Sequence, residues 1–564
     1  MQLDRRQFGA LLGAILAASG KGWSAAGEAA DDDGSPGPER LARQCLDRLT
    51  FGARPADLAE FQRLGLERWL ERQLERPESD PELDRRLRAA RLPMRYEAGK
   101  DEQGRRWKAV DELRPYRHLD DDPEALLLLG DYERLGVDYE ERIRPAREVQ
   151  AASLIRAVHA EGQVREVLTQ FWHEHFSVQS TKSERTAAFF GEYDRLLRRH
   201  ALGNFRVLLG EVARSPAMLH FLDNESSKAS PANENFAREL LELHTLGAEH
   251  YANQRYGHWS EVPGARAGLA QLYIDEDVYE AARALTGWSF GDGRYLRDGD
   301  QAPRSGRFHY VDAWHDPYQK RILGVEFAPN AAPLADGEKL LDLLAAHPAT
   351  ARHIATKLVR RLLADEPPPE LVASVAGVFL EQREAPDQIA RVVRHLALSP
   401  HFVRRPPEKL KRPFEFLASL YRGLGAEVRS PSLSFHWALF RCGWGQHECR
   451  PPTGHPDQNR HWANTNYLAG LLDLSLQAFE PWFGASEHDL LRALPGEVHR
   501  LDQAARFFAE ALVGAGRAGE LAQNVSAPLA AEIGAELDRE EGLRAYQVKA
   551  MLALVAVSPA FLLR

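Results

Sequence analysis

The chain has 564 residues, of which 44% are hydrophobic and 27% are charged, and its net charge is −10. These proportions are ordinary for a folded globular protein, and the acidic balance gives no reason to expect binding to nucleic acid. The length exceeds what one simple core accommodates, so it indicates two or more packed lobes.

The first 26 residues contain the parts of a twin-arginine export signal. Arg5 and Arg6 stand together, residues 9–18 are apolar and uncharged, and residues 24–26 form a small-residue cleavage site. The apolar run is about half of the ~20 residues needed to cross a bilayer, which disfavours a membrane anchor. We therefore expect residues 1–26 to be a signal peptide that engages the twin-arginine translocase. The mature protein is expected in the periplasm or outside the cell, with no stable membrane span.

After the signal, residues 27–38 are rich in Gly, Asp, Ser and Pro and predict a polar linker. From Leu41 onward apolar residues recur at helical spacing almost throughout, and strand-like alternation is scarce. The sequence therefore predicts an all-α fold of two packed helical lobes with long irregular loops. We expect a main helical domain over residues 39–430 and a C-terminal helical lobe over residues 431–564.

Two kinds of interruption punctuate the helical pattern. Three long polar stretches predict loops, of which the last has room for a small hairpin; they are residues 92–122, 251–272 and 291–330. A Ser-Pro pair also follows a helical run three times. Serine as the N-cap and proline at the first helical position predict that a helix restarts at Ser215-Pro216, Ser399-Pro400 and Ser558-Pro559.

The cysteine and glycine patterns disfavour two classes of cofactor, haem and nucleotides. Cys45 lies in an apolar helical pattern and is interpreted as a core residue. Cys442 and Cys449 stand seven apart, and in an oxidising compartment they either form a disulfide or remain free thiols. The chain has no C-x-x-C-H haem attachment motif, no phosphate-binding glycine loop and no Gly-rich dinucleotide turn, so neither haem nor a nucleotide is expected.

Two histidines lie on apolar helix faces. In the helix predicted over Val164–Phe176, His175 falls within the apolar face and His173 points to the opposite one. In a second helix, beginning near Asn233, His244 again lies among the apolar residues. A buried imidazole needs a partner for each ring nitrogen, and a metal ion with a carboxylate beyond it supplies both. The alternative is a core histidine bonded to a carbonyl and a side chain.

The acidic face of the second helix permits two interpretations. Glu239 and Glu242 lie opposite the leucines, where they either line an internal cleft or form a solvated face with an Arg238–Glu242 ion pair. Glu239 and His244 are able to share one ion only if the helix ends or bends near Gly247.

Further candidate ligands lie in two loops. They are His309, His315, Asp316, His455 and Asp457. Asp316 is placed to orient His315 or to bind beside it, and the prolines and glycine around His455 predict a rigid surface loop. His353, in contrast, falls off the apolar face of its helix, and we expect it to be solvated.

Several of these segments resemble the bacterial family called domain of unknown function 1800. The matching segments are residues 48–52, 170–176, 233–247, 281–288, 315–324 and 451–456. The resemblance implies an exported protein that is often encoded beside a second exported protein related to sulfatases and phosphatases. It implies no reaction.

Three functional hypotheses follow. The first is a metal-dependent periplasmic enzyme, with an oxidoreductase ahead of a hydrolase, using a divalent transition metal such as iron, copper, manganese or zinc. The second is a non-catalytic binding or assembly partner of the co-encoded exported protein. The third is a metal-independent hydrolase, for which no nucleophile is evident.

The most specific prediction concerns geometry. We predict that three histidines converge on one metal site and that three further residues lie in or beside its coordination sphere. The predicted ligands are His175, His244 and His315, and the supporting residues are His173, Glu239 and Asp316.

Overall fold

The computed structural model describes residues 37–130, 136–255, 257–296, 300–483 and 488–564. The predicted signal peptide and nearly all of the predicted linker lie outside these residues. The described part contains 27 α-helices and short antiparallel strand pairs, so the predicted mostly α-helical fold is confirmed. None of the described helices is long and apolar enough to cross a membrane.

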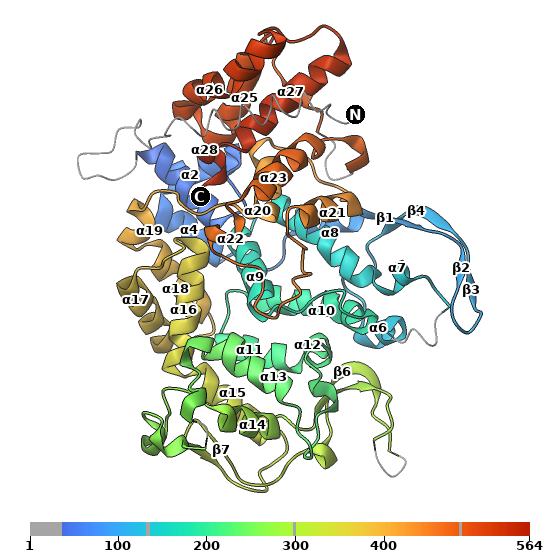
Figure 1. Cartoon of the computed structure of the whole chain (residues 1–564), viewed down its shortest axis with the longest axis vertical. Helices are drawn as coiled ribbons and strands as arrows, with labels where there is room; N and C mark the ends of the chain where they lie inside the picture. The colour runs from blue at the N-terminus through green and yellow to red at the C-terminus, as the bar shows by residue number, and fades with distance from the viewer. Residues whose placement is uncertain (1–36, 131–135, 256, 297–299, 484–487) are drawn as a thin grey trace.

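The middle of the molecule is a set of helices that includes α9, the helix of His173 and His175 (Figure 1). Its members are α8 (Arg144–His159), α9 (Gln163–Phe176), α10 (Glu184–His200), α20 (Pro413–Gly423), α21 (Leu433–Arg441), α22 (Asn459–Trp462) and α23 (Thr465–Gln477). Residues 144–158 of α8 are all buried, as expected for a helix that is covered by neighbours on every side. α9 lies beside it.

The lower part of Figure 1 contains the helices that follow α10, together with two hairpins. The helices are α11 (Phe205–Arg214), α12 (Pro216–Phe221), α13 (Glu234–Glu239), α14 (Asp275–Ala284) and α15 (Ala335–Ala345). The hairpins pair β5 (Trp288–Asp292) with β6 (Arg304–Tyr310), and β7 (Lys320–Ile322) with β8 (Val325–Phe327). Short 3₁₀ turns are η1 (Asn224–Ser226), η3 (Ala248–His250), η4 (Asn253–Arg255), η5 (Trp259–Glu261), η6 (Ala265–Ala267) and η7 (Asp312–Trp314).

A column of helices on the left of Figure 1 connects the lower part to the upper part. It contains α16 (Pro348–Leu362), α17 (Pro369–Glu381), α18 (Gln388–Ala397) and α19 (Pro400–Arg404). The upper part contains η8 (Pro481–Phe483), α24 (Leu490–Ala493), α25 (Leu501–Val513), α26 (Ala515–Ile533), α27 (Glu541–Ala556) and α28 (Pro559–Leu562). The N-terminal helices α2 (Pro38–Leu49), α3 (Pro55–Leu64), α4 (Leu66–Leu74) and α5 (Pro81–Ala89) lie below these.

The stretch predicted as a loop over residues 92–122 instead forms two strand pairs. β1 (Arg91–Tyr96) pairs with β4 (Val110–Pro115), and β2 (Gly99–Lys100) pairs with β3 (Arg106–Trp107). Alternation is present only in β1, where Leu92 and Met94 are buried, whereas β4 is mostly exposed and charged. The alternating run is therefore too short for a strand to be recognised from the sequence. The helices α6 (Pro123–Gly130) and α7 (Tyr139–Arg142) follow.

The three Ser-Pro pairs behave as predicted. α12, α19 and α28 each begin at the proline, with the serine as the N-cap residue. The buried apolar residues form one continuous cluster that extends from Ala42 to Leu562. The division into lobes at residue 430 stays a prediction.

Candidate functional site

Helix α9 sends two histidines in opposite directions. The Nε2 atom of His173 lies 3.0 Å from a carboxylate oxygen of Asp194 on α10, whereas Nε2 of His175 lies 3.1 Å from the main-chain oxygen of His244. Residues two apart on an α-helix differ by about 200° in direction. The two rings therefore enter different environments, as the spacing predicts.

His175 and His244 lie side by side in the core. Each residue is 1% exposed, and their ring centroids are 6.2 Å apart. Trp172 and Phe176 meet the rings edge-on, at 5.4 Å from His175 and 5.2 Å from His244 respectively. His175 donates to the main chain of His244, and the main chain of Phe176 hydrogen-bonds to the His244 ring. Each imidazole is thus held by the main chain of the segment that carries the other.

The second ring nitrogen of each histidine is left without a partner. Nδ1 of His175 and Nδ1 of His244 are both buried, and neither has a hydrogen-bond partner among the described residues. Burial, and next the charge of Lys357, lower the pKa of His244 to about 3 and the pKa of His175 well below its usual value. Both rings are therefore neutral at neutral pH. With the proton on the nitrogen that bonds to a carbonyl, each Nδ1 carries a free lone pair.

A π-helical turn positions His244. Helix α13 continues directly into η2 (Leu240–Thr245), which is a π-helix. The Thr245 hydroxyl donates to the main-chain oxygen of Leu240, five residues earlier, at 2.6 Å, and Gly247 ends the segment with a φ of +94°. π-turns are rare and frequently occur at functional sites. This deformation sets the direction of the His244 ring.

The ion pairs on the acidic face of α13 differ from the expected one. Arg238 pairs with Glu234 at 3.2 Å and with Asp275 at 3.1 Å, so the expected Arg238–Glu242 ion pair is wrong. α14 packs against α13 and supplies Asp275, a partner that a helical wheel does not contain. Burial, and next the charge of Glu242, raise the pKa of Glu239. No hydrogen bond or ion pair joins Glu239 to any described residue.

His353 belongs to the histidine cluster, and the expectation that it is solvated is wrong. Its side chain is 14% exposed, and its ring lies 6.2 Å from that of His175. Its Nε2 is 3.2 Å from the main-chain oxygen of Leu243, and its Nδ1 is 3.4 Å from the Glu249 carboxylate. The reason is tertiary, because α16 packs its polar face against η2.

Lys357 lies one helical turn beyond His353 on the same face. It makes no hydrogen bond or ion pair with a described residue, and burial lowers its pKa to about 8 although Asp457 and Glu174 act in the other direction. The cluster of His175, His244 and His353 thus has a weakly basic amine beside it.

The loop that carries His455 and Asp457 covers the end of α9. The main-chain N–H of His455 donates to the Glu174 carboxylate at 2.9 Å, and its ring stacks on Trp444 at 4.2 Å. Its Nε2 lies 2.9 Å from a main-chain oxygen. Asp457 pairs with Arg412 at 3.2 Å. Both residues therefore anchor the loop beside the residue that precedes His175.

His173 belongs to a separate buried network. Its ring lies 4.1 Å from the ring of His447, with the two planes tilted by 40°, and His447 has a left-handed backbone with a φ of +56°. Nε2 of His447 lies 3.0 Å from the Ser153 hydroxyl. Burial raises the pKa of Asp194, but Arg198 and the other cations around it bring the net pKa well below its usual value. An adjacent cavity of about 10 Å³ is the size of one water molecule.

His315 and His309 lie apart from the His175–His244 pair. Nδ1 of His315 is 3.0 Å from the main-chain oxygen of Thr286, and its Nε2 is 3.3 Å from Asp336. Both ring nitrogens therefore already face oxygen acceptors. His309 is half-buried in β6, opposite Ser289 of β5.

Asp316 is part of a clamp that holds its own loop. Its carboxylate receives two hydrogen bonds from Arg283, at 2.9 and 3.0 Å. The buried ammonium of Lys320 donates to the main-chain oxygens of Asp316 and Tyr318 and to the carboxylate of Asp336, at 2.6 to 2.8 Å. The recurrence of Lys320 after His315-Asp316 in the sequence is therefore explained by contacts that hold this loop in place.

The structure thus brings together His175 and His244, adds His353 and Lys357, and leaves His315 and Asp316 in another network. Within the described ranges, no group of three or more His, Cys, Asp or Glu side chains is arranged to hold a metal ion. Sequence reasoning missed His353 and Lys357. Their spacing of four showed a shared helix face, but not what that face contacts.

No curated protein and no solved structure matches the chain. The model of one family, described as "Protein of unknown function (DUF1800)", matches residues 44–563. This match covers nearly the whole chain, and the chain therefore belongs to the DUF1800 family.

Proposed function

We propose that the protein is an exported, metal-dependent oxidoreductase whose redox centre lies at the buried imidazoles of His175 and His244. One observation carries the proposal: two neutral imidazoles lie side by side, and each has a buried Nδ1 that no described residue satisfies. Histidines that bind a metal usually donate their other N–H to a carbonyl or carboxylate. His175 does so toward the main chain of His244.

The donor set suits a redox metal. Imidazole nitrogens favour copper, iron, nickel and zinc, and of these copper and iron change oxidation state readily. A bound ion of this kind would supply one-electron chemistry. The two Nδ1 atoms would hold it, while His353 and Glu249 border the cluster. The positive charge of Lys357 disfavours a metal cation nearby. The negative charges of Asp457 and Glu174 offset this effect.

Burial favours an oxidoreductase over a hydrolase. A hydrolytic metal centre needs an open position that water and substrate reach directly. The two imidazoles are instead enclosed by Phe171, Trp172 and Phe176. Electron transfer does not require such access, and apolar surroundings tune the potential of a metal. A buried histidine cluster also supports an enzyme over a purely non-catalytic partner.

Metal analysis of protein purified from its native compartment tests the proposal. We expect copper or iron in near-stoichiometric amount in the wild type, and its loss in His175→Gln and His244→Gln, because glutamine retains a donor but lacks Nδ1. His347→Gln is the matched control. That histidine is also buried, but Nε2 contacts the main chain of Ala270 and Nδ1 accepts from Ala349. Wild-type protein without a transition metal, or equal loss in the control, would contradict the proposal.

Export is the second part of the proposal. Arg5 and Arg6 precede a short apolar run, and the twin-arginine route carries folded proteins, which permits metal loading before export. Replacement of both arginines by lysine should leave the precursor in the cytoplasm. Normal appearance of that variant in the periplasmic fraction would reject this route.

A further inference from the structure

A serine, a histidine and a glutamate meet where α10 begins. Oγ of Ser183 lies 3.0 Å from Nε2 of His220, and Nδ1 of the same ring lies 3.1 Å from a carboxylate oxygen of Glu225. Ser183 is the N-cap residue of α10, His220 lies near the end of α12, and Glu225 belongs to η1. Both distances are within the range that joins a nucleophile to its base and the base to an orienting group. We call these three residues the serine triad.

The fold itself positions the members of the serine triad. α12 packs against α10, which places His220 beside the start of α10. Asp223 then adopts a left-handed backbone with a φ of +60°, and the turn that it makes leads into η1 and Glu225. The Ser289 hydroxyl donates to the main-chain oxygen of Glu225 at 2.7 Å. The carboxylate is therefore held next to the ring by contacts that need no ligand.

The charge state of Glu225 fixes the protons of the serine triad. Burial raises the pKa of Glu225, but the hydrogen bond from His220 and the charges of Arg294 and Arg185 bring the net pKa below its usual value. An ionised carboxylate only accepts hydrogen bonds, so Nδ1 of neutral His220 carries the proton and Nε2 carries the lone pair. The Ser183 hydroxyl is therefore the donor in its contact with Nε2. In this arrangement a histidine removes the proton of a serine nucleophile.

The serine triad reaches the surface of the molecule. The side chain of Glu225 is 13% exposed and that of His220 is 24% exposed, and Ser183 is also partly exposed. The main-chain N–H groups of residues 184 and 185 open α10 and donate to no described residue. Free N–H groups of this kind stabilise the negative charge that develops on a carbonyl oxygen under attack.

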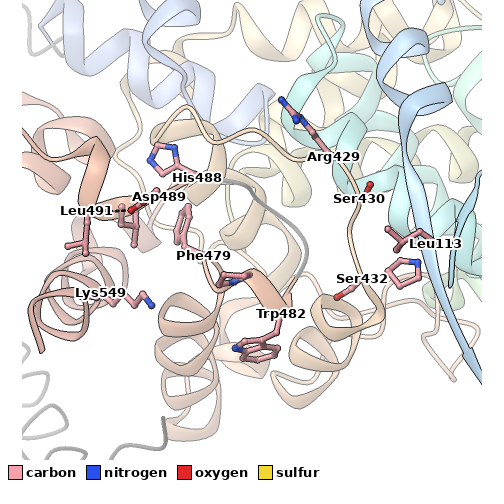
Figure 2. A pocket seen from close by; sticks show the side chains of 14 residues that line it. Leu113, Arg429, Ser430, Ser432, Phe479, Trp482, His488, Asp489, Leu491 and Lys549 are labelled. Carbon is pink, nitrogen blue, oxygen red and sulfur yellow. Dashed lines mark hydrogen bonds between the residues drawn. The ribbon is translucent and has the colours of Figure 1, made fainter. Parts of the chain in front are cut away.

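Serine and histidine also occur together elsewhere, but without the carboxylate. Ser374 on α17 lies 2.7 Å from Nε2 of His395, and no described carboxylate contacts the other nitrogen of that ring. Ser430 and Ser432 line a cavity of about 710 Å³ between the β1–β4 hairpin and the C-terminal helices, and His488 lies on its opposite side (Figure 2). The carboxylate of Glu225 thus distinguishes the serine triad from these groups.

We propose that the protein has a serine esterase activity, with Ser183 as the nucleophile, His220 as the general base and Glu225 as the residue that positions the base. Because the residues around Ser183 leave it only partly covered, the substrate class is a carboxylic ester with a short acyl group. The serine triad shares no residue with the metal centre proposed at His175 and His244, so each proposal stands or fails alone.

The reaction has two halves. Oγ of Ser183 attacks the carbonyl carbon of the ester while its proton passes to Nε2 of His220, and the bond to the alcohol oxygen then breaks as the ring gives that proton to the departing alcohol. Water next attacks the acyl carbon and loses a proton to Nε2. The bond between Oγ and the acyl carbon breaks, Oγ recovers the proton, and the carboxylic acid leaves.

A fluorophosphonate probe tests the nucleophile directly, because an activated serine displaces its fluoride and stays covalently bound to phosphorus. We expect one label per folded full-length chain, located at Ser183 by peptide mass spectrometry, and saturable hydrolysis of p-nitrophenyl acetate. Ser183→Asn keeps an N-cap side chain but removes the hydroxyl, so labelling and hydrolysis should be lost. His220→Gln should slow both by about 100-fold or more. Glu225→Gln should lower kcat by about 100-fold and leave KM unchanged, because the carboxylate does not contact the ester.

Two serine variants are the matched controls. Ser399 caps α19 by accepting from the main-chain N–H of Phe402 at 3.2 Å, and Ser399→Ala tests the loss of a cap alone. Ser374→Ala removes a serine whose histidine has no carboxylate. Both variants should keep wild-type labelling and hydrolysis, and circular dichroism with urea midpoints verifies that every variant is folded. An unlabelled wild type, a label at another residue, or unchanged rates in folded Ser183→Asn or His220→Gln would overturn the proposal.

Discussion

His159 should make the protein measurably less stable in mild acid. It is the last residue of α8, and its Nε2 accepts a hydrogen bond from the main-chain N–H of Val428 at 3.0 Å. A protonated ring has no lone pair with which to accept this bond. Burial, and next the charge of Arg86, lower the pKa of His159 to about 4 from a usual value of 6.5. The folded protein therefore holds this ring neutral.

The sign and size of the effect follow from this difference. As the pH falls, the unfolded chain takes up the proton before the folded protein does. The contribution of His159 to the free energy of unfolding is therefore complete above pH 6.5 and declines toward pH 4. At 1.36 kcal/mol per pKa unit, the total loss is about 3 kcal/mol, of which about 2 kcal/mol has occurred at pH 5. His159→Gln keeps an acceptor for Val428 and removes the titration.

Urea unfolding monitored by tryptophan fluorescence at about pH 7.5 and about pH 5 measures the effect. The other buried histidines lower stability in acid equally in both proteins, so the difference between wild type and variant isolates His159. We expect the variant to lose about 2 kcal/mol less than the wild type between these two pH values. The exposed His461, replaced by glutamine, is the control. A variant whose pH dependence matches the wild type would refute the reasoning.

Three further outcomes are expected. Lys320→Met should lower the free energy of unfolding by about 3–5 kcal/mol because it leaves the Asp336 carboxylate buried without its cation. The metal content should stay unchanged. A loss of stability below about 1 kcal/mol would contradict the role of Lys320 in holding the loop. His173→Gln should destabilise the protein by removing the ring that bonds Asp194, again without loss of metal, and urea unfolding with metal analysis measures both. All three cysteines are free thiols, so alkylation after denaturation without reductant should modify three sites by mass spectrometry; two fewer would indicate a Cys442–Cys449 disulfide.

Local patterns predicted the parts of the fold that depend on nearby residues. A helical period along α9 predicted that His173 and His175 face opposite directions, and both contacts agree. The Ser-Pro pairs predicted three helix starts because an N-cap and a proline act within one turn. These features need no knowledge of what packs against the helix.

The candidate site depends on contacts that the helical period does not contain. η2 is a π-helix, so the direction of His244 departs from the regular 100° step. His353 lies off the apolar face of α16, yet that polar face docks on η2 and is largely buried. The His315 loop looked able to reach the pair, but Lys320 clamps it to Asp336 instead. For His353 and the His315 loop, a partner outside the local helical pattern decided the outcome.

The two histidines of α9 show why the free lone pair lies at His175. His173 meets a carboxylate that two arginines keep ionised, so its ring is held as a donor within a charge network. His175 meets aromatic rings and a main-chain oxygen, which take one N–H and offer nothing to the second nitrogen. An unsatisfied buried acceptor lowers stability by about 1–3 kcal/mol, and His175 on α9 and His244 on η2 each carry this cost. A ligand that uses both lone pairs at once would offset that cost, and this is the reason for the metal proposed at this face of α9.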